Sequence, residues 1–252
     1  MRIYLRSFNA ILTRDLRNLI LNPVMIMSNS VFPLLLIAVL GYMTGTVYGG
    51  GEVTSYDYYG VTILIFTALN VSMIAANSFM EKSLKTSNLR ILYSPIPTFY
   101  IYVSKMAATF LFASASSFLL IGLTRLLFGI NFGGGNWICV ALILTGFNLF
   151  SSALGVLLCC LLKSEELSNK ILSMINNALA LVGGLFFQLD GLGSAIETIS
   201  YLSPVKWVAE AVFRIIYDHD FGLFLPSVGF CILGTLLLLW GCKLTFRAED
   251  YV

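Results

Sequence analysis

The sequence has few charged residues, one histidine and no phosphate-binding loop. Asp, Glu, Lys and Arg make up 11% of its 252 residues, whereas hydrophobic residues make up 58%. Soluble domains carry about 25% charged residues, so a soluble chain of this size could not cover its surface with so few. His219 is the only histidine, which argues against a histidine-based metal or nucleophile site. Without a Gly-x-x-x-x-Gly-Lys-Ser/Thr motif, the chain is not expected to cradle nucleotide phosphates.

The charges that are present leave long apolar runs between them. About 20 apolar residues are needed to cross a hydrocarbon core of about 30 Å, and each run meets that length. The fourth run begins with a Gly- and Asn-rich turn between Phe128 and Asn136, where no helix is expected. We therefore predict an all-α integral membrane protein with one transmembrane domain. Its six transmembrane helices are predicted at about residues 24–46, 58–80, 106–128, 137–162, 169–189 and 221–245.

Lys and Arg are concentrated on alternate connections between these spans. Cytoplasmic loops close to helix ends carry an excess of these residues. The N-terminal segment, the second and fourth connections and the C-terminal tail hold all but three of the fifteen basic residues. Only Arg125, Lys206 and Arg214 fall on the other side. The distribution predicts a multi-pass protein of the cytoplasmic (cell) membrane with both termini in the cytoplasm.

Residues 1–22 have the pattern of an amphipathic helix. Apolar residues such as Leu12 and Leu16 recur every three or four positions, while Arg2, Arg6 and Arg17 lie on another face. Such a helix can lie in the membrane interface with its arginines toward lipid phosphates. Asp15 lies near the edge of the apolar face and weakens the pattern. The alternative is a juxtamembrane helix that packs on the bundle.

Two further segments are expected to form short helices outside the spans. In the cytoplasmic loop 81–105, residues 81–93 can form about three turns before Pro95 ends them. That helix would either dock on a soluble partner or connect two spans in solvent. In the external segment 190–220, Ser203 and Pro204 are a good N-cap and first-turn pair. The helix after them is too short to cross, so we expect a re-entrant or interfacial hairpin, with Glu210 spaced to pair with Lys206 or Arg214.

Polar residues near the centres of the predicted spans are uncharged. The spans have no acidic or basic residue near their centres, which argues against a proton-coupled carrier. We expect most of the amides to form interhelical hydrogen bonds and a minority to line a pathway. These amides are Asn70, Asn77, Asn148, Asn176, Asn177 and Gln188.

Three stretches of the chain carry family motifs. Residues 81–105 have an acidic, Leu-Arg, small, Pro, Lys order, and residues 148–155 have a Ser-Ser-Ala-Leu-Gly helix end. Residues 183–211 keep a Leu-Ser-Pro, Trp and Glu-Ala order and spacing. With these motifs the chain resembles, over nearly its whole length, the membrane subunit of an ABC transporter of the type-2 exporter class. Gln188 departs from the pattern, because a proline often follows the paired aromatics there.

The resemblance implies a permease subunit that is not itself an enzyme and needs no cofactor or metal of its own. A cytoplasmic ABC ATPase subunit would bind ATP and Mg²⁺, and a second permease subunit, identical or homologous, would complete a pathway within membrane lipid. No nucleic acid is involved. The implied coupling residues are Glu81, Ser83, Leu84, Leu89, Arg90, Leu92 and Pro95; those of the interfacial helix are Arg2, Arg6 and Arg17; those of the external hairpin and gate are Gly183, Gly184, Phe187, Pro204, Trp207 and Glu210.

The sequence indicates the substrate less clearly than it indicates the subunits of the transporter. The favoured hypothesis is an ATP-driven exporter of an amphiphilic molecule, such as a drug, an antimicrobial peptide or a lipid-like compound. An exporter of a lipid-linked polysaccharide and an ion-coupled secondary carrier are the alternatives. An intramembrane enzyme lacks a suitable acidic or His/Cys constellation in the spans, whereas an assembly scaffold stays open.

Overall fold

The computed structural model describes residues 2–45, 53–80, 97, 99–187 and 198–246, with only the backbone for residues 2–5. The described part of the chain contains helices and no strand, which confirms the all-α prediction. In chain order the elements are α1 (Arg2–Leu21), α2 (Pro23–Ile26), the π-helical turn η1 (Met27–Val31), α3 (Phe32–Met43), α4 (Ser55–Met80), α6 (Phe99–Phe128), the 3-10 turn η3 (Gly134–Asn136), α7 (Trp137–Leu162), α8 (Glu165–Val182), α10 (Pro204–Phe213), the π-helical turn η4 (Arg214–Asp218) and α11 (Phe224–Thr245).

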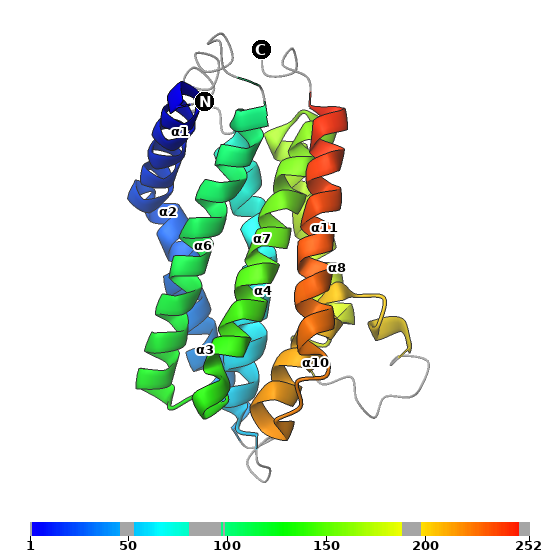
Figure 1. Cartoon of the computed structure of the whole chain (residues 1–252). Coiled ribbons are helices and arrows are strands. Elements are labelled where there is room, and N and C mark those ends of the chain that lie inside the picture. The colour runs from blue at the N-terminus through cyan, green and yellow to red at the C-terminus, as the bar shows by residue number, and fades with distance from the viewer. Residues whose placement is uncertain (1, 46–52, 81–96, 98, 188–197, 247–252) are drawn as a thin grey trace.

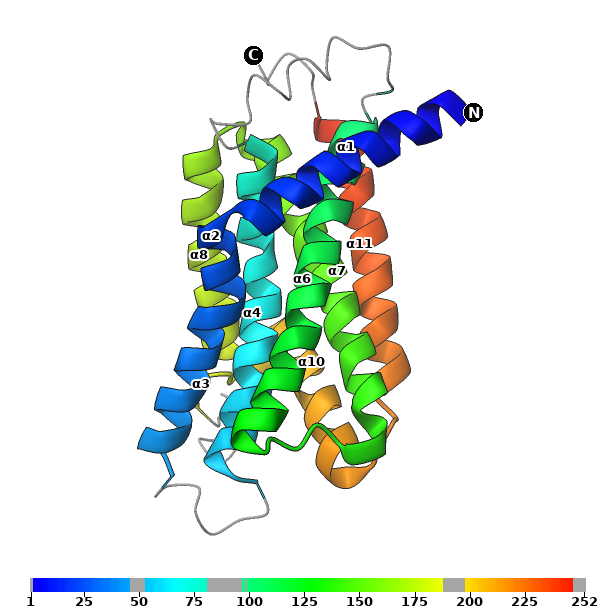
Figure 2. The ribbon, with the colours of Figure 1, turned by 90° about the vertical axis from the view of Figure 1, so that its left-hand side faces the viewer.

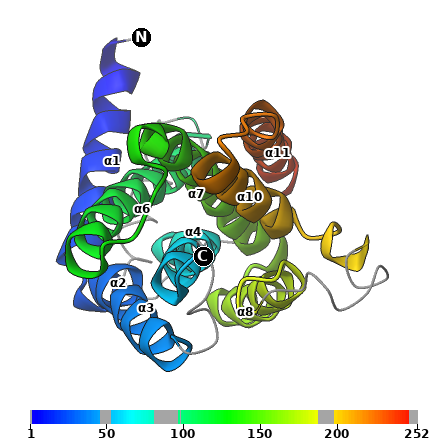
Figure 3. The same ribbon diagram turned by 90° about the horizontal axis from the view of Figure 1, so that it is seen from below.

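The long helices form an elongated bundle around α4. Seen along the bundle, α3, α6, α7 and α8 surround α4 (Figure 3), and most of the α4 side chains are buried. One end of the bundle carries α1 and the C-terminal end of α11, and the other carries α10 and the α6–α7 connection (Figure 1). Helix α1 crosses the first of these ends obliquely, against α6 (Figure 2).

Among the described residues, five helical segments are long and apolar enough to cross a membrane. They are residues 23–43, 55–80, 99–128, 134–162 and 224–245. The outer surface of α11 is apolar and exposed: Leu225, Leu237 and Trp240 are 77%, 67% and 63% exposed. A face of this composition is stable in lipid and unfavourable in water. The chain is therefore a multi-pass membrane protein. Helix α8 has 18 residues, about 27 Å at 1.5 Å per residue, but three of its first six residues are charged.

Helix α6 begins earlier than the sequence pattern predicts. The expected boundary placed residues 81–105 in a loop and started the span at 106, because Lys105 ends the apolar run. The helix instead begins at Phe99, and the Lys105 side chain is 1% exposed. The prediction was wrong at this boundary because an ion pair with Asp15 lets the lysine lie inside the bundle.

Helix α8 ends at Val182, seven residues before the predicted end of its span. The Leu185 N–H donates to the Ala180 carbonyl at 3.0 Å, and the Gly184 N–H donates to the Leu181 carbonyl at 3.2 Å. This pair of bonds is the Schellman arrangement, which requires a left-handed residue after the helix. Gly184 supplies it with a φ of 73°, a conformation that glycine adopts without steric cost.

Candidate functional site

A crevice in the apolar bundle is lined by amides and hydroxyls. It lies between the α2–η1–α3 segment, α4 and α8, and its volume is about 390 Å³. No described residue that lines it is charged. Its polar lining consists of Ser28, Asn29, Thr67, Asn70, Asn77, Ser173 and Asn177. The crevice can therefore form hydrogen bonds with a guest molecule without offering it a counter-ion.

Asn29 is the member of this lining with an unmet hydrogen-bonding need. It lies in the π-helical turn η1 and is 2% exposed. Its Nδ2 finds no hydrogen-bond partner among the described residues. An unsatisfied amide away from water costs about 1–3 kcal/mol, and π-helical turns occur frequently at functional sites. Both features make Asn29 a candidate for contact with a guest molecule in the crevice.

Other amides join neighbouring helices of the bundle. The Asn176 amide donates to the Asn70 Oδ1 at 3.1 Å and to the Ser72 Oγ at 3.0 Å. The Asn148 amide donates to the Ser117 Oγ at 3.1 Å. These bonds connect α8 to α4 and α7 to α6, so the prediction that most intramembrane amides form interhelical hydrogen bonds holds for them.

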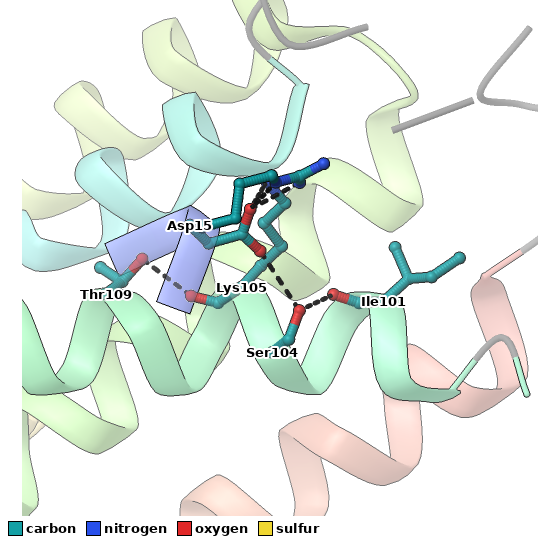
Figure 4. A network of polar contacts seen from close by, with 6 residues as sticks. Asp15, Ile101, Ser104, Lys105 and Thr109 are labelled. Atoms are coloured by element: carbon teal, nitrogen blue, oxygen red, sulfur yellow. Dashed lines mark hydrogen bonds and ion pairs between the residues drawn. The ribbon is translucent and has the colours of Figure 1, made fainter. Parts of the chain in front are cut away.

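A buried charge cluster joins α1 to α6 at the end of the bundle where α1 lies. The Lys105 Nζ lies 2.9 Å from the Asp15 Oδ1, and the two side chains are 1% and 0% exposed. The Arg14 guanidinium approaches the same oxygen at 2.6 Å. The Ser104 hydroxyl donates to the other carboxylate oxygen at 3.3 Å (Figure 4). One carboxylate thus faces two cations, and most of the cluster is shielded from solvent.

At the opposite end, α10 folds back onto the bundle through its apolar face. Ser203 is its N-cap residue and Pro204 is its first residue, as predicted. The Ser203 hydroxyl donates to the Leu179 carbonyl of α8 at 2.9 Å. Val205, Val208 and other residues of the predicted stripe are fully or nearly fully buried. The predicted ion pair is also present, because the Arg214 guanidinium lies 2.6 Å from the Glu210 carboxylate, which raises the pKa of Arg214.

A second cavity of about 450 Å³ lies between α10, η4, the end of α8 and the first half of α4. Two buried hydroxyls in its lining, those of Thr62 and Tyr217, have no hydrogen-bond partner among the described residues. Burial raises the pKa of Tyr217, and the Asp57 carboxylate adds to the rise. The Tyr217 phenol is therefore neutral at physiological pH and available as a hydrogen-bond donor.

The structure brings three of the predicted gate residues, Gly183, Gly184 and Glu210, to the lining of the second cavity, and it leaves the coupling residues undescribed. At Gly183, a side chain would lie 3.0 Å from Val205, so this glycine lets α8 and α10 approach closely. Trp207 donates its indole N–H to the Tyr201 carbonyl at 2.9 Å, and Phe187 is 46% exposed. Arg6 and Arg17 are exposed on α1, whereas the Arg2 side chain lies outside the described residues. So do all the predicted coupling residues: Glu81, Ser83, Leu84, Leu89, Arg90, Leu92 and Pro95.

The family model of the ABC-2 type transporter matches residues 6–217, which include most of α1, the crevice and α10. The chain belongs to the ABC-2 type transporter family. A search of curated proteins finds no match. Members of this family are the membrane components of ABC transporters and work with ABC ATPase subunits. As an ABC-2 type permease, the chain carries no catalytic machinery of its own.

Sequence reasoning missed two features of this permease. Asn29 lies close to the predicted start of a span, and a single sequence gives no sign of a π-helical turn. Asp15 interrupts the amphipathic stripe of residues 1–22, and this interruption is the sequence signal for a buried ion pair. A carboxylate on an apolar face must find a cation, and Lys105 is a cation at the border of a predicted span.

Proposed function

We propose that the chain is the permease half of an ATP-driven ABC exporter for an amphiphilic molecule. The observation that carries the proposal is the uncharged, amide-lined crevice in the membrane bundle of an ABC-2 type permease. Its hydrogen-bonding groups suit the polar part of an amphiphile, and neighbouring apolar residues such as Phe32 and Phe66 suit its apolar part. Two permease subunits, identical or homologous, would enclose the pathway that begins there.

We propose six spans, with α8 as the fifth. At about 27 Å, α8 matches the hydrocarbon thickness closely, and its charged residues lie at the end of the bundle that carries α1. That same end carries most of the described cations, including Arg6, Arg17 and Lys243, whereas the opposite end carries Arg125, Lys206 and Arg214. The excess supports cytoplasmic termini in the cell membrane. It also supports an external position for α10, with the gate residues near the exit.

The ATPase would act on residues 81–96, and Glu81, Leu89 and Arg90 belong to that contact. The test is co-purification of the chain with its cognate ATPase and measurement of ATP hydrolysis in lipid nanodiscs. Leu89→Glu is expected to dissociate or uncouple the ATPase, because a carboxylate would enter an apolar contact, whereas Leu89→Met should not. If Leu89→Glu leaves both assembly and stimulated hydrolysis unchanged, the contact is elsewhere.

The crevice is tested with Asn29→Ala and the neighbouring control Ser30→Ala. Ser30 belongs to the same turn but does not line the crevice. Cells that express the transporter are challenged with a panel of amphiphilic drugs, antimicrobial peptides and lipid analogues. Asn29→Ala should change the protection against at least one compound about tenfold, and Ser30→Ala should resemble the wild type. Transport in vesicles that is driven by an ion gradient without ATP would instead identify a secondary carrier.

A further inference from the structure

The contact between α1 and α6 has one directional element. Along most of its length the contact is apolar: the Phe8 and Tyr100 rings lie 5.5 Å apart, and Leu19 packs in a cluster with Ala108 and Phe112. Such contacts permit sliding, because apolar attraction has no preferred direction. The Asp15–Lys105 ion pair, in contrast, fixes one register of the two helices.

The ion pair is not needed to fill space or to add stability. Replacing a buried ion pair by apolar residues of similar volume is often neutral or stabilising, because the charges must lose their water. A buried pair therefore points to a role in specifying an arrangement. Here the arrangement is the position of α1 on α6 (Figure 4), which the Ser104 hydroxyl also supports through the second carboxylate oxygen.

The two partners of the ion pair lie on helices that lead to different parts of the protein. Lys105 is in the second turn of α6, which begins at Phe99, a few residues after the stretch proposed to contact the ATPase. Asp15 is on α1, which ends at Leu21 and continues through the Asn22 cap into α2 and η1. Residues of α2 and η1, including Asn29, form one wall of the crevice. The pair thus stands between the ATPase side of α6 and that wall.

We propose that Asp15 and Lys105 form a fixed joint that transmits movement of α6 to α1 and hence to the crevice wall. Both are positioning residues: neither lines the crevice, and each acts through the helix that carries it. The inference rests on the proposed function, because the movement comes from the ATPase. The Arg14 guanidinium lies 2.6 Å from the same Asp15 oxygen that Lys105 contacts.

The test compares the wild type with the double variant Asp15→Asn/Lys105→Met, which removes both buried charges and leaves only the partly exposed Arg14 cation at this position. Glu166→Gln/Lys170→Gln is the matched control, since it removes an exposed ion pair of 2.6 Å at the same end of the bundle. Each is purified with its ATPase in nanodiscs. Hydrogen–deuterium exchange is compared between the nucleotide-free and the vanadate-trapped complexes, together with ATP hydrolysis.

In the wild type and the control, trapping should change exchange both in residues 99–104 and in residues 23–31. In the double variant, ATP hydrolysis should stay within about twofold and the change at 99–104 should persist, but the change at 23–31 should be lost. The single variant Lys105→Arg keeps a cation opposite Asp15 and should therefore keep the exchange change at residues 23–31. If the exchange change at residues 23–31 persists in the double variant, the proposed joint is wrong.

Two further outcomes separate this inference from the proposal beneath it. If the wild-type complex hydrolyses no ATP, the proposed function fails and the joint fails with it. If the wild type hydrolyses ATP and responds at 99–104 but never at 23–31, the proposed function stands and only the joint is overturned. Should the double variant not assemble, Lys105→Met, which leaves Asp15 beside Arg14, is measured in its place with the same expected loss.

Discussion

Gly155 of α7 lies so close to Ser72 of α4 that a Cβ at position 155 would overlap the Ser72 carbonyl oxygen. The overlap is with backbone, which cannot rotate away as a side chain can. Small residues at such crossings let helix backbones approach closely in membranes. The Asn148–Gly155 stretch is also one of the motifs that carry the family resemblance, and this contact gives a physical reason for its final glycine.

Gly155→Ala is therefore expected to destabilise the permease. Overpacking of a well-packed interface costs about 1–3 kcal/mol, so the Tm of the purified protein in detergent should fall by several degrees. Gly122→Ala in α6 is the control, because a Cβ there meets no atom within 4 Å and alanine favours the helix. Equal Tm values for the two variants would contradict the close contact between α4 and α7.

The Asp15–Lys105 ion pair predicts that the two single variants lose unequal amounts of stability. Asp15→Asn leaves the buried Lys105 ammonium beside a neutral amide, and removing one partner of a buried pair costs about 3–5 kcal/mol. Lys105→Met should cost less, because the Arg14 guanidinium remains 2.6 Å from the Asp15 carboxylate.

Tm measurements on the two single variants and the double variant check this order. The double variant Asp15→Asn/Lys105→Met should recover most of the loss caused by Asp15→Asn alone, since no buried charge is left: the remaining cation, Arg14, is 30% exposed. A double variant that is less stable than either single variant would show that the two residues do not interact.

Neighbouring asparagines on α8 should separate stability from transport. Asn176 is fully buried and donates to Asn70 and Ser72, and hydrogen bonds between membrane helices contribute about 0.6 kcal/mol on average and up to about 1.7 kcal/mol. Asn176→Ala should lower the Tm. Asn177 is exposed at the crevice, so Asn177→Ala should keep the wild-type Tm and change only the substrate-dependent protection of cells. The reverse pattern would exclude the crevice as the substrate contact.

Asp57 predicts a local effect at the α6–α7 connection. Its carboxylate accepts bonds from the Thr54 hydroxyl at 2.6 Å and from the Asn131 N–H at 2.8 Å, so it connects the start of α4 to the α6–α7 connection. Asp57→Ala should speed hydrogen–deuterium exchange at residues 129–133, because the Asn131 N–H loses its acceptor. Asp57→Asn retains one acceptor oxygen and should have the smaller effect. Unchanged exchange in Asp57→Ala would show that this bond does not order the connection.

The helical membrane architecture and the family could be predicted from the sequence because they depend on composition and local spacing. Apolar runs of spanning length mark helices wherever they lie in the chain, and Ser203 and Pro204 mark the start of α10 as its N-cap and first residues. The Glu210–Arg214 pair follows in the same way from one-turn spacing on a helix. These features can be predicted without knowing which residues pack against them in the folded protein.

The tertiary structure alone decided where polar groups are satisfied. Lys105 reads as a loop cation until Asp15, ninety positions earlier, is brought beside it, and only then does α6 extend back to Phe99. Asn29 and Asn176 are the same residue type in apolar surroundings, yet one finds acceptors on α4 and the other faces a crevice. The physical reason is that the cost of a buried charge or amide is set by partners distant in sequence, which hydropathy along the chain does not contain.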